Sequence, residues 1–217
     1  MKEYKILFID EEEEEQDKFY NYFEKVCPEV VPECLLPKAS VDDMLGVIFD
    51  KHADAVVTDF LLNDIRTYVK YNVNYNGVEL IKELRKSREN FPCFVMTSHD
   101  DEAVNNTDDV NVVYIKEQLS SDINTTNVTF AQRIIRQIEK YRANIDAAKN
   151  ELNALIDKRG RGEAGVYDED RIIVLDSFLE RTYGTYDAVP SEMKKLSNLD
   201  KLNELIGKAD EILRKLE

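Results

Sequence analysis

The chain has 217 residues, of which 43% are apolar, and its formal net charge is −15. The apolar content predicts a packed core. The chain contains no run of about 18 apolar residues, so no membrane span is expected. Acidic residues outnumber basic ones, and no basic face dominates the chain. Because binding to nucleic acid needs such a face to release counterions, nucleic-acid binding is not expected. Three cysteines without CxxC spacing indicate reduced thiols and a cytoplasmic protein.

Short apolar segments alternate with amphipathic ones through the first half of the chain. Such alternation predicts a parallel α/β sheet with helices on both faces. Ser40, followed three residues later by Asp43, is expected to cap one of the helices. The predicted strands cover residues 5–10, 33–37, 53–60, 92–98 and 111–117, and the predicted helices cover residues 14–26, 41–52 and 77–89.

The pattern changes after about residue 127, so we expect an α/β domain over residues 1–126 and an all-α region over residues 127–217. Apolar residues with 3/4 spacing form a heptad seam along one long helix. Two more helices are expected after glycine-containing breaks, one with Ile172, Leu175 and Leu179 on its apolar stripe and one over residues 199–216. The seam is Ala131, Ile134, Ile138, Tyr141, Ile145, Ala148, Leu152 and Leu155.

This seam has two interpretations, a coiled coil and a helical bundle. The helix either forms a homodimer through residues 128–158, which we favour, or folds back on the later helices. The sequence of the helical region contains no evident catalytic motif.

Polar residues follow four of the predicted strands. Because the carboxyl ends of parallel strands meet at one edge of the sheet, these residues are expected to converge. Carboxylate oxygens suit Mg²⁺, and an aspartate can form an acyl phosphate that a hydroxyl and an ammonium group stabilise. The residues are Asp10 and Glu11 after the first strand, Asp59 after the third, Thr97 after the fourth and Lys116 after the fifth. Glu12 to Glu15 are expected to be mostly surface residues at a helix start.

Five segments in this order, FIDE, VVTDF, NGVELI, FVMTS and YIKE, resemble the receiver domain of two-component response regulators over residues 3–126. The resemblance implies a flavodoxin-like, doubly wound sheet with strand order 2-1-3-4-5. It also implies a phosphoryl donor that is a sensor histidine kinase or a phosphotransfer protein. By position it assigns the phosphoacceptor to Asp59, Mg²⁺ ligands to Asp10, Glu11, Asp59 and the backbone carbonyl of Leu61, the switch hydroxyl to Thr97, and the phosphoryl-contacting lysine to Lys116.

The chain departs from the family pattern at three places. Glu117 stands where a proline usually follows the lysine, and Tyr114 is displaced by one position from the usual aromatic residue. Residues 60–76 form a longer connection than usual and lack the usual proline.

The first functional hypothesis is therefore a Mg²⁺-dependent response regulator that is phosphorylated on Asp59 and signals through protein contacts of its helical region. It would not be an enzyme beyond catalysing its own phosphoryl transfer and hydrolysis. A DNA-binding regulator is the alternative, with only Lys194, Lys195, Lys201 and Lys208 in its favour. A Mg²⁺-dependent phosphatase is a third hypothesis, but Leu61 and Glu12 stand where it needs a second aspartate.

Overall fold

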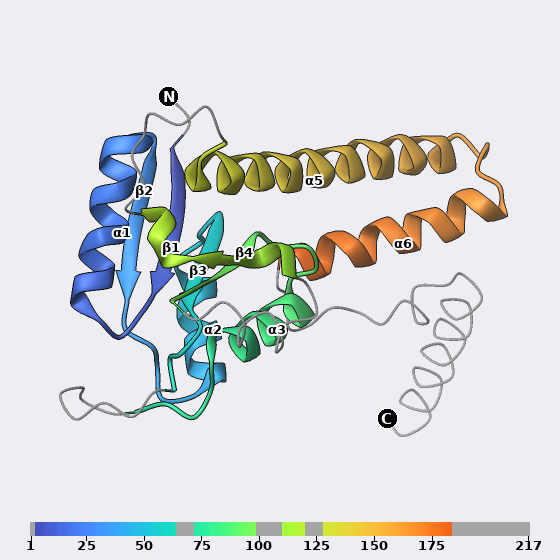
Figure 1. The fold of residues 1–217 in the computed structure, drawn as a ribbon. Helices are drawn as coiled ribbons and strands as arrows, with labels where there is room; N and C mark the ends of the chain where they lie inside the picture. The colour runs from blue at the N-terminus through green and yellow to red at the C-terminus, as the bar shows by residue number, and fades with distance from the viewer. Residues whose placement is uncertain (1–2, 64–71, 99–109, 120–127, 184–217) are drawn as a thin grey trace, which may run out of the picture. The chain divides into compact units, whose positions relative to one another are not determined.

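The computed structural model describes residues 3–63, 72–98, 110–119 and 128–183, which form two compact units, Met1–Arg142 and Ala143–Glu217 (Figure 1). The predicted last helix at 199–216, the four lysines of the DNA-binding alternative and residues 64–71 of the long connection lie outside the described residues.

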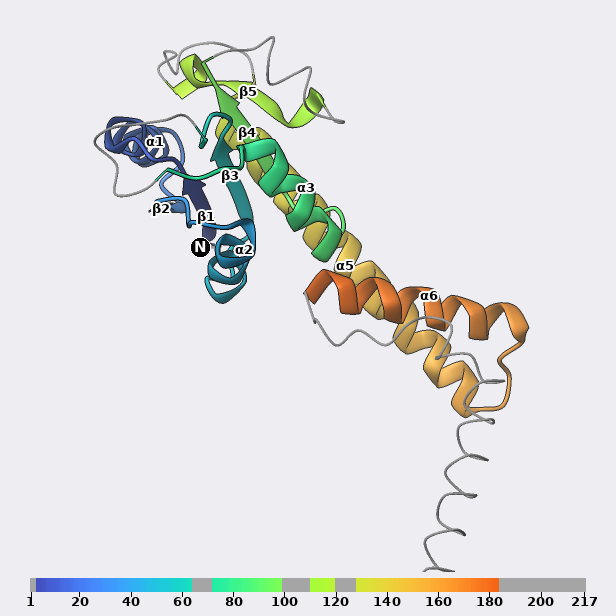
Figure 2. The ribbon, with the colours of Figure 1, turned by 90° about the horizontal axis from the view of Figure 1, so that it is seen from below.

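The first unit contains a five-stranded parallel sheet in the order β2-β1-β3-β4-β5. Helix α1 (Glu13–Val26) and the start of α5 (Phe130–Gly160) pack on one face of the sheet. Helices α2 (Val41–Asp50) and α3 (Gly77–Ser87) pack on the other face, and Figure 2 shows them across the strands from α1. This is the predicted flavodoxin-like order with helices on both faces, so the predicted fold class is confirmed. The strands are β1 (Tyr4–Ile9), β2 (Val30–Leu35), β3 (Ala55–Asp59), β4 (Cys93–Thr97) and β5 (Val113–Ile115).

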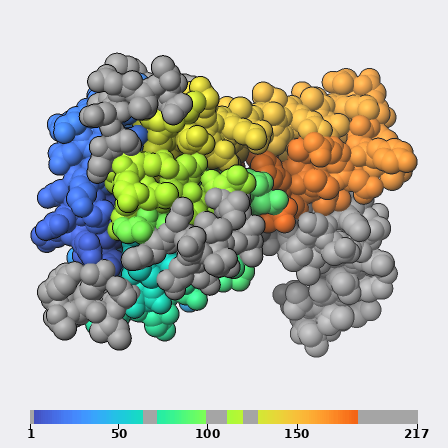
Figure 3. Space-filling model, viewed as in Figure 1, coloured from blue at the N-terminus to red at the C-terminus, as the bar shows by residue number. Residues whose placement is uncertain are grey.

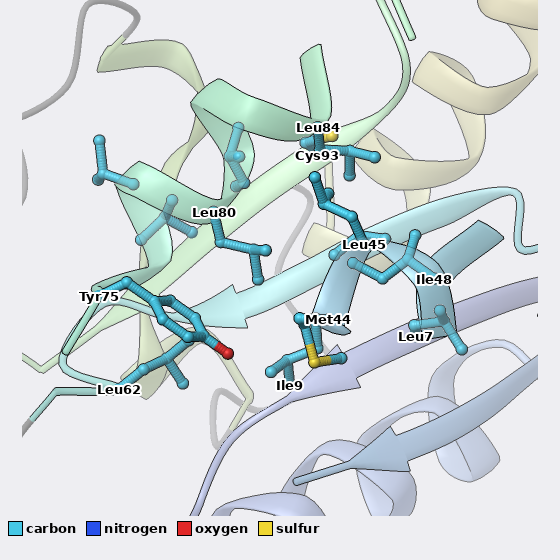
Figure 4. Packing of buried hydrophobic residues seen from close by; sticks show 14 of the residues in the cluster. Leu7, Ile9, Met44, Leu45, Ile48, Leu62, Tyr75, Leu80, Leu84 and Cys93 are labelled. Carbon is cyan, nitrogen blue, oxygen red and sulfur yellow. The ribbon is translucent and has the colours of Figure 1, made fainter. Parts of the chain in front are cut away.

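Successive residues of β1 fill two separate cores because side chains alternate across a strand. Ile6 and Phe8 pack toward α1 and α5, and Phe8 stacks on a phenylalanine of α1 at a ring-centroid distance of 4.2 Å. Leu7 and Ile9 pack toward α2 and α3, where they meet Met44 (Figure 4). All four β1 side chains are fully buried, so this strand is held on both faces.

The edge strand β2 begins three residues earlier than the sequence pattern predicts. Val30 and Val31 pair with Tyr4 and Lys5 of β1, and the strand continues through Pro32. A proline has no N–H for a ladder hydrogen bond, but an edge strand tolerates this residue.

The first turns of α5 belong to the core of the first unit. A capping box starts the helix, because Thr129 accepts a hydrogen bond from the Gln132 backbone N–H and the Gln132 side chain accepts one from the Thr129 N–H. The Phe130 ring lies 4.9 Å from the Tyr114 ring of β5, and the two segments lie side by side in Figure 3. The beginning of the heptad seam, Ala131, Ile134 and Ile138, is therefore buried against the sheet.

In the second unit, the later part of α5 packs against α6 (Val166–Tyr183). Ala148 of the seam lies in one cluster with Leu175 and Leu179. Gly162 allows the turn between the helices, since it has a positive φ of 72°. The fold-back of α5 on α6 is thus observed, while the homodimer through residues 128–158 stays a prediction. None of the described helices has the length and apolarity that crossing a membrane requires.

Candidate functional site

Four predicted site residues stand at the carboxyl ends of neighbouring strands. Asp10 follows β1, Asp59 ends β3, Thr97 ends β4 and Lys116 follows β5. All these strands run parallel, so their ends share one edge of the sheet, where α/β folds of this kind bind ligands. The structure brings Asp10, Asp59 and Lys116 into direct contact.

Lys116 lies between the two aspartates. Its Nζ atom is 2.9 Å from Asp10 Oδ2 and 2.7 Å from Asp59 Oδ1. The side chains are 13% exposed for Lys116, 1% for Asp10 and 8% for Asp59. Because water screens these charges poorly, their interactions are stronger than those of surface ion pairs.

The charges at this site do not balance. Burial raises the pKa of Asp10 to about 7, with the Asp59 charge adding to this rise and Lys116 opposing it. Burial by itself would lower the pKa of Lys116, but the Asp59 and Asp10 carboxylates outweigh it and hold that pKa above its ordinary value. Two carboxylates thus share one ammonium group, which leaves a demand for a proton or a further cation.

Backbone N–H groups fix one oxygen of each aspartate. The Glu12 N–H donates to Asp10 Oδ1 over 2.9 Å, and the Leu61 N–H donates to Asp59 Oδ2 over 2.8 Å. The Gln16 side chain of α1 also donates to the Asp10 carbonyl, at 2.6 Å. The other two carboxylate oxygens are those that face Lys116, so the site has a defined orientation.

The glutamate run contributes more to the site than its sequence predicts. Glu13 and Glu14 are exposed, as expected, and Glu11 is half-buried beside Asp10. The side chain of Glu15 is only 12% exposed, and its Oε2 atom lies 3.9 Å from Lys116 Nζ. The expectation of a surface position is therefore wrong for Glu15. Its place in the first turn of the helix that follows Asp10 could have indicated this position, because that helix starts at the edge of the sheet where the strands end.

Thr97 is buried at the end of β4, which lies between β3, the strand that ends in Asp59, and β5, the strand that precedes Lys116. Asp59 pairs with Met96 in the ladder, and Thr97 pairs with Ile115, the residue before Lys116. Thr97 therefore sits one residue beyond the ladder partner of Asp59. Its role as a switch hydroxyl stays a prediction.

Gly77, the first residue of α3, lies directly against the backbone of Asp59. A Cβ atom at this position would come within 2.1 Å of the Asp59 carbonyl oxygen and 2.9 Å of Thr58 Cγ2. The Gly77 N–H donates to the Phe60 carbonyl over 3.0 Å, and the Asn76–Glu79 capping box fixes the helix start. Glycine is required here because two backbone segments approach closely.

The segment that carries Lys116 differs from its predicted form. Lys116 does not extend β5 but begins a short 3₁₀ helix, η2 (Lys116–Leu119), and Leu119 anchors it in the core. No peptide bond in the described part of the chain is cis, including the one before Glu117. Tyr114 contacts Phe94 at a ring-centroid distance of 5.8 Å as well as Phe130 of α5.

The residues of this edge fit a Mg²⁺ ion by charge and chemistry. Asp10 and Asp59 supply two hard carboxylates at a buried place with excess negative charge. Within residues 3–63, 72–98, 110–119 and 128–183, no group of three or more His, Cys, Asp or Glu is placed to hold a metal ion. Mg²⁺ usually takes only one or two carboxylates, with water and phosphate oxygens completing its shell, so two suffice. Glu11 and the Leu61 carbonyl stay predicted ligands.

We expect the Asp10→Asn variant to be more stable than the wild type in a chelator, by about 1–2 kcal/mol near neutral pH. The substitution removes one of two buried charges and keeps an oxygen for the Glu12 N–H. An unfolded aspartate ionises near 3.8 and Asp10 in the fold ionises near 7, so ionisation lowers stability as the pH rises between these values. The gain should therefore shrink at about pH 5. Urea unfolding measures it.

Urea unfolding in the presence of Mg²⁺ tests whether Asp10 is a metal ligand. Mg²⁺ should stabilise the wild type by mass action and should stabilise Asp10→Asn much less. Asp50→Asn makes the same chemical change at an exposed position and should behave like the wild type. An equal response to Mg²⁺ in all three proteins would contradict the assignment.

Comparison with known proteins gives structural matches only. No protein-family model matches the chain, and no curated protein matches it. A fusion that contains a trimeric coiled-coil segment of yeast Spc42 is 16% identical, with a TM-score of 0.46, covering 72% of this chain and 97% of that one. The RcsB response regulator of Salmonella typhimurium is 14% identical, with a TM-score of 0.43, covering 100% of this chain and 84% of that one.

A third match, an RcsB–DNA complex, is 11% identical with a TM-score of 0.42, and it covers 90% of this chain and 98% of that one. At such similarity none of these matches bears on activity. The fold assignment rests on the strand order and on the helices of both faces, and this arrangement is the one that a receiver domain has.

Proposed function

We propose that the chain is a response regulator whose first unit accepts a phosphoryl group on Asp59. The observation that carries the proposal is the contact of Lys116 with both Asp10 and Asp59, at the strand ends of a sheet in 2-1-3-4-5 order. Three charged groups from three strand ends are buried together there, although each would be more stable in water. Such clustering is typical of functional sites.

In the proposed reaction, Asp59 Oδ1 attacks the phosphorus of the donor. An O–P bond to Asp59 forms, and the bond from phosphorus to the donor's leaving atom breaks, with its electron pair going to that atom. With a phosphohistidine donor, the leaving imidazole nitrogen takes up a proton. The Leu61 N–H holds Asp59 Oδ2, so the other oxygen is presented to the donor.

Lys116 supplies a fixed positive charge beside the attacking oxygen, where the transferring group develops negative charge. Thr97 stands on the intervening strand as the predicted hydroxyl contact. Mg²⁺, held by Asp10 and Asp59, would neutralise charge on the phosphoryl oxygens. A protonated Lys116 is ensured at neutral pH because its pKa lies above the ordinary value.

The helical region would act as the output, through contacts with a protein partner, and the phosphoryl donor would be a sensor histidine kinase or a phosphotransfer protein in the cytoplasm. Phosphorylation would shift the population of two arrangements of the first unit. Helix α5 supports this proposal, because it starts in the core beside β5, the strand that precedes Lys116, and continues beyond the first unit.

Intact-mass measurement after incubation with Mg²⁺ and acetyl phosphate tests the proposal. The wild type should gain about 80 Da, the mass of one phosphoryl group, and lose it again in hydroxylamine, which cleaves acyl phosphates. Asp59→Asn should gain nothing. Asp50→Asn, an exposed aspartate in α2, should be modified like the wild type.

Modification of Asp59→Asn to the same extent as the wild type would reject the assignment of the phosphoacceptor. Absence of any mass gain in the wild type with acetyl phosphate, and also with a phosphorylated histidine kinase, would reject the proposed function itself.

A further inference from the structure

A cavity lies in the first unit, away from the Asp59 site, at the side where α5 passes β5. Its volume is about 380 Å³, within the range of small-ligand pockets. It contains none of the residues of the Asp59 site. The cavity is lined by Arg85, Cys93, Phe94, Asn111, Val112, Tyr114, Arg133, Arg136, Gln137 and Lys140.

Four of the lining residues are cations, and none of the described lining residues is acidic. Arg133, Arg136 and Lys140 follow one another at i, i+3 and i+7, so they lie on one face of α5. Arg85 faces them from the last turn of α3. The chain has a net charge of −15, so four positive charges around one cavity give this part of the surface a charge opposite to that of the whole chain.

These three α5 cations are not engaged in ion pairs with any residue that the structure describes, although acids are near in the sequence. Glu139 accepts a hydrogen bond from the Tyr4 hydroxyl, over 3.0 Å. Arg142 pairs with Asp54 over 2.6 Å. The neighbouring charges on α5 are thus directed to other partners, whereas Arg133, Arg136 and Lys140 face the cavity without an ion-pair partner among the described residues.

The inner wall of the cavity is apolar and aromatic. Phe94 and Val112 are buried, and the Tyr114 ring lies beside Phe94. Burial also raises the pKa of the Cys93 thiol to about 12, so this wall carries no thiolate at neutral pH. An apolar wall with cations and two amides, Asn111 and Gln137, suits a ligand that has both a ring and an anionic group.

We propose that this cavity binds a small phosphorylated molecule with a planar ring, of the size of a nucleoside monophosphate. Arginine guanidinium groups bind phosphate oxygens in pairs, and four cations around one cavity suit a phosphate, with about two negative charges, better than a carboxylate with one. A long polyanion is disfavoured, because the strongly acidic remainder of the chain repels it. The cavity does not include Asp59, so a ligand bound there would regulate the protein separately from phosphorylation.

Isothermal titration calorimetry of the full chain with adenosine 5′-monophosphate tests the proposal, in a chelator so that the Asp59 site binds no metal. Inorganic phosphate and adenosine are the two partial probes. The nucleotide should bind more tightly than either probe, because only it contacts both the cations and the aromatic wall.

The double variant Arg133→Gln/Arg136→Gln should bind the nucleotide about tenfold more weakly or worse. Both residues are exposed, so the fold should be retained, which circular dichroism checks. The matched control is Arg159→Gln/Arg161→Gln, which removes the same charge at exposed positions near the end of α5 and should bind like the wild type.

Asp59→Asn should also bind adenosine 5′-monophosphate with full affinity. The nucleotide proposal can therefore fail without the phosphorylation proposal failing, and the reverse also holds. Three results would overturn the inference: no heat with any probe, equal loss in the two double variants, or phosphate binding as tightly as the nucleotide. Tight binding of duplex DNA that both double variants weaken alike would show general electrostatic attraction and would overturn it as well.

Discussion

The Lys116→Met variant should lose about 3–5 kcal/mol of unfolding free energy in a chelator near neutral pH, because it leaves two buried carboxylates without their cation. Methionine keeps most of the length of the side chain, so the loss reports charge more than packing. Urea unfolding followed by circular dichroism measures it. Mg²⁺ should recover part of the loss, since a divalent ion supplies the positive charge that the variant lacks.

Combining Lys116→Met with Asp10→Asn isolates the electrostatic origin of this loss. The double variant should be clearly more stable than Lys116→Met alone, because one of the two facing charges has been removed. Lys86→Met removes a lysine that pairs with Glu83 over 2.6 Å at the surface, and it should change stability by only about 0.5 kcal/mol. If Lys116→Met and Lys86→Met are equally mild, the buried charge cluster does not stabilise the fold as argued.

Replacing Gly77 by alanine should destabilise the first unit by about 3 kcal/mol and slow phosphorylation of Asp59 on the order of 100-fold. The added Cβ would lie 2.1 Å from the Asp59 carbonyl oxygen, so either the start of α3 or the end of β3 must move. Both are backbone, and neither can rotate away as a side chain can. Thermal unfolding and the rate of mass gain with acetyl phosphate measure the two effects.

Gly46→Ala is the matched control for Gly77→Ala. Gly46 lies inside α2, and a Cβ there would meet no atom within 4 Å. Alanine favours a helix interior over glycine, so this variant should be more stable by about 0.5–1 kcal/mol and should be phosphorylated normally. If Gly77→Ala and Gly46→Ala give the same stability and the same rate of phosphorylation, the close approach of α3 to Asp59 affects neither property.

The sequence is most informative where a local pattern and the global topology agree. Apolar runs bounded by charge predict β1, β3 and β4 to within two residues at either end, because these strands are buried on both faces. Once the strands are parallel, their end residues must share an edge, and this alone brings Asp10, Asp59 and Lys116 together. The contact between Lys116 and both aspartates needed the structure.

Features that depend on partners far away in the chain could not be predicted in this way. Nothing in the local sequence near Pro32 shows that β1 pairs with it, so β2 was placed too late. The heptad seam of α5 looks uniform, yet its first residues pack on a sheet and its later residues pack on α6. Periodicity identifies an apolar face but not what covers it.

The two outer strands of the sheet have a consequence for how this molecule meets other proteins. β2 contains Pro32, which has no N–H to offer a neighbouring strand, and β5 has only three residues between two 3₁₀ turns. In the part of the chain that the structure describes, both margins of the sheet are therefore poor templates for a strand from another polypeptide, as proline and short length make an edge strand. The same two features disfavour recognition by β-augmentation, in which a partner adds a strand to the sheet, so we expect a partner protein to bind side chains of the helices and loops.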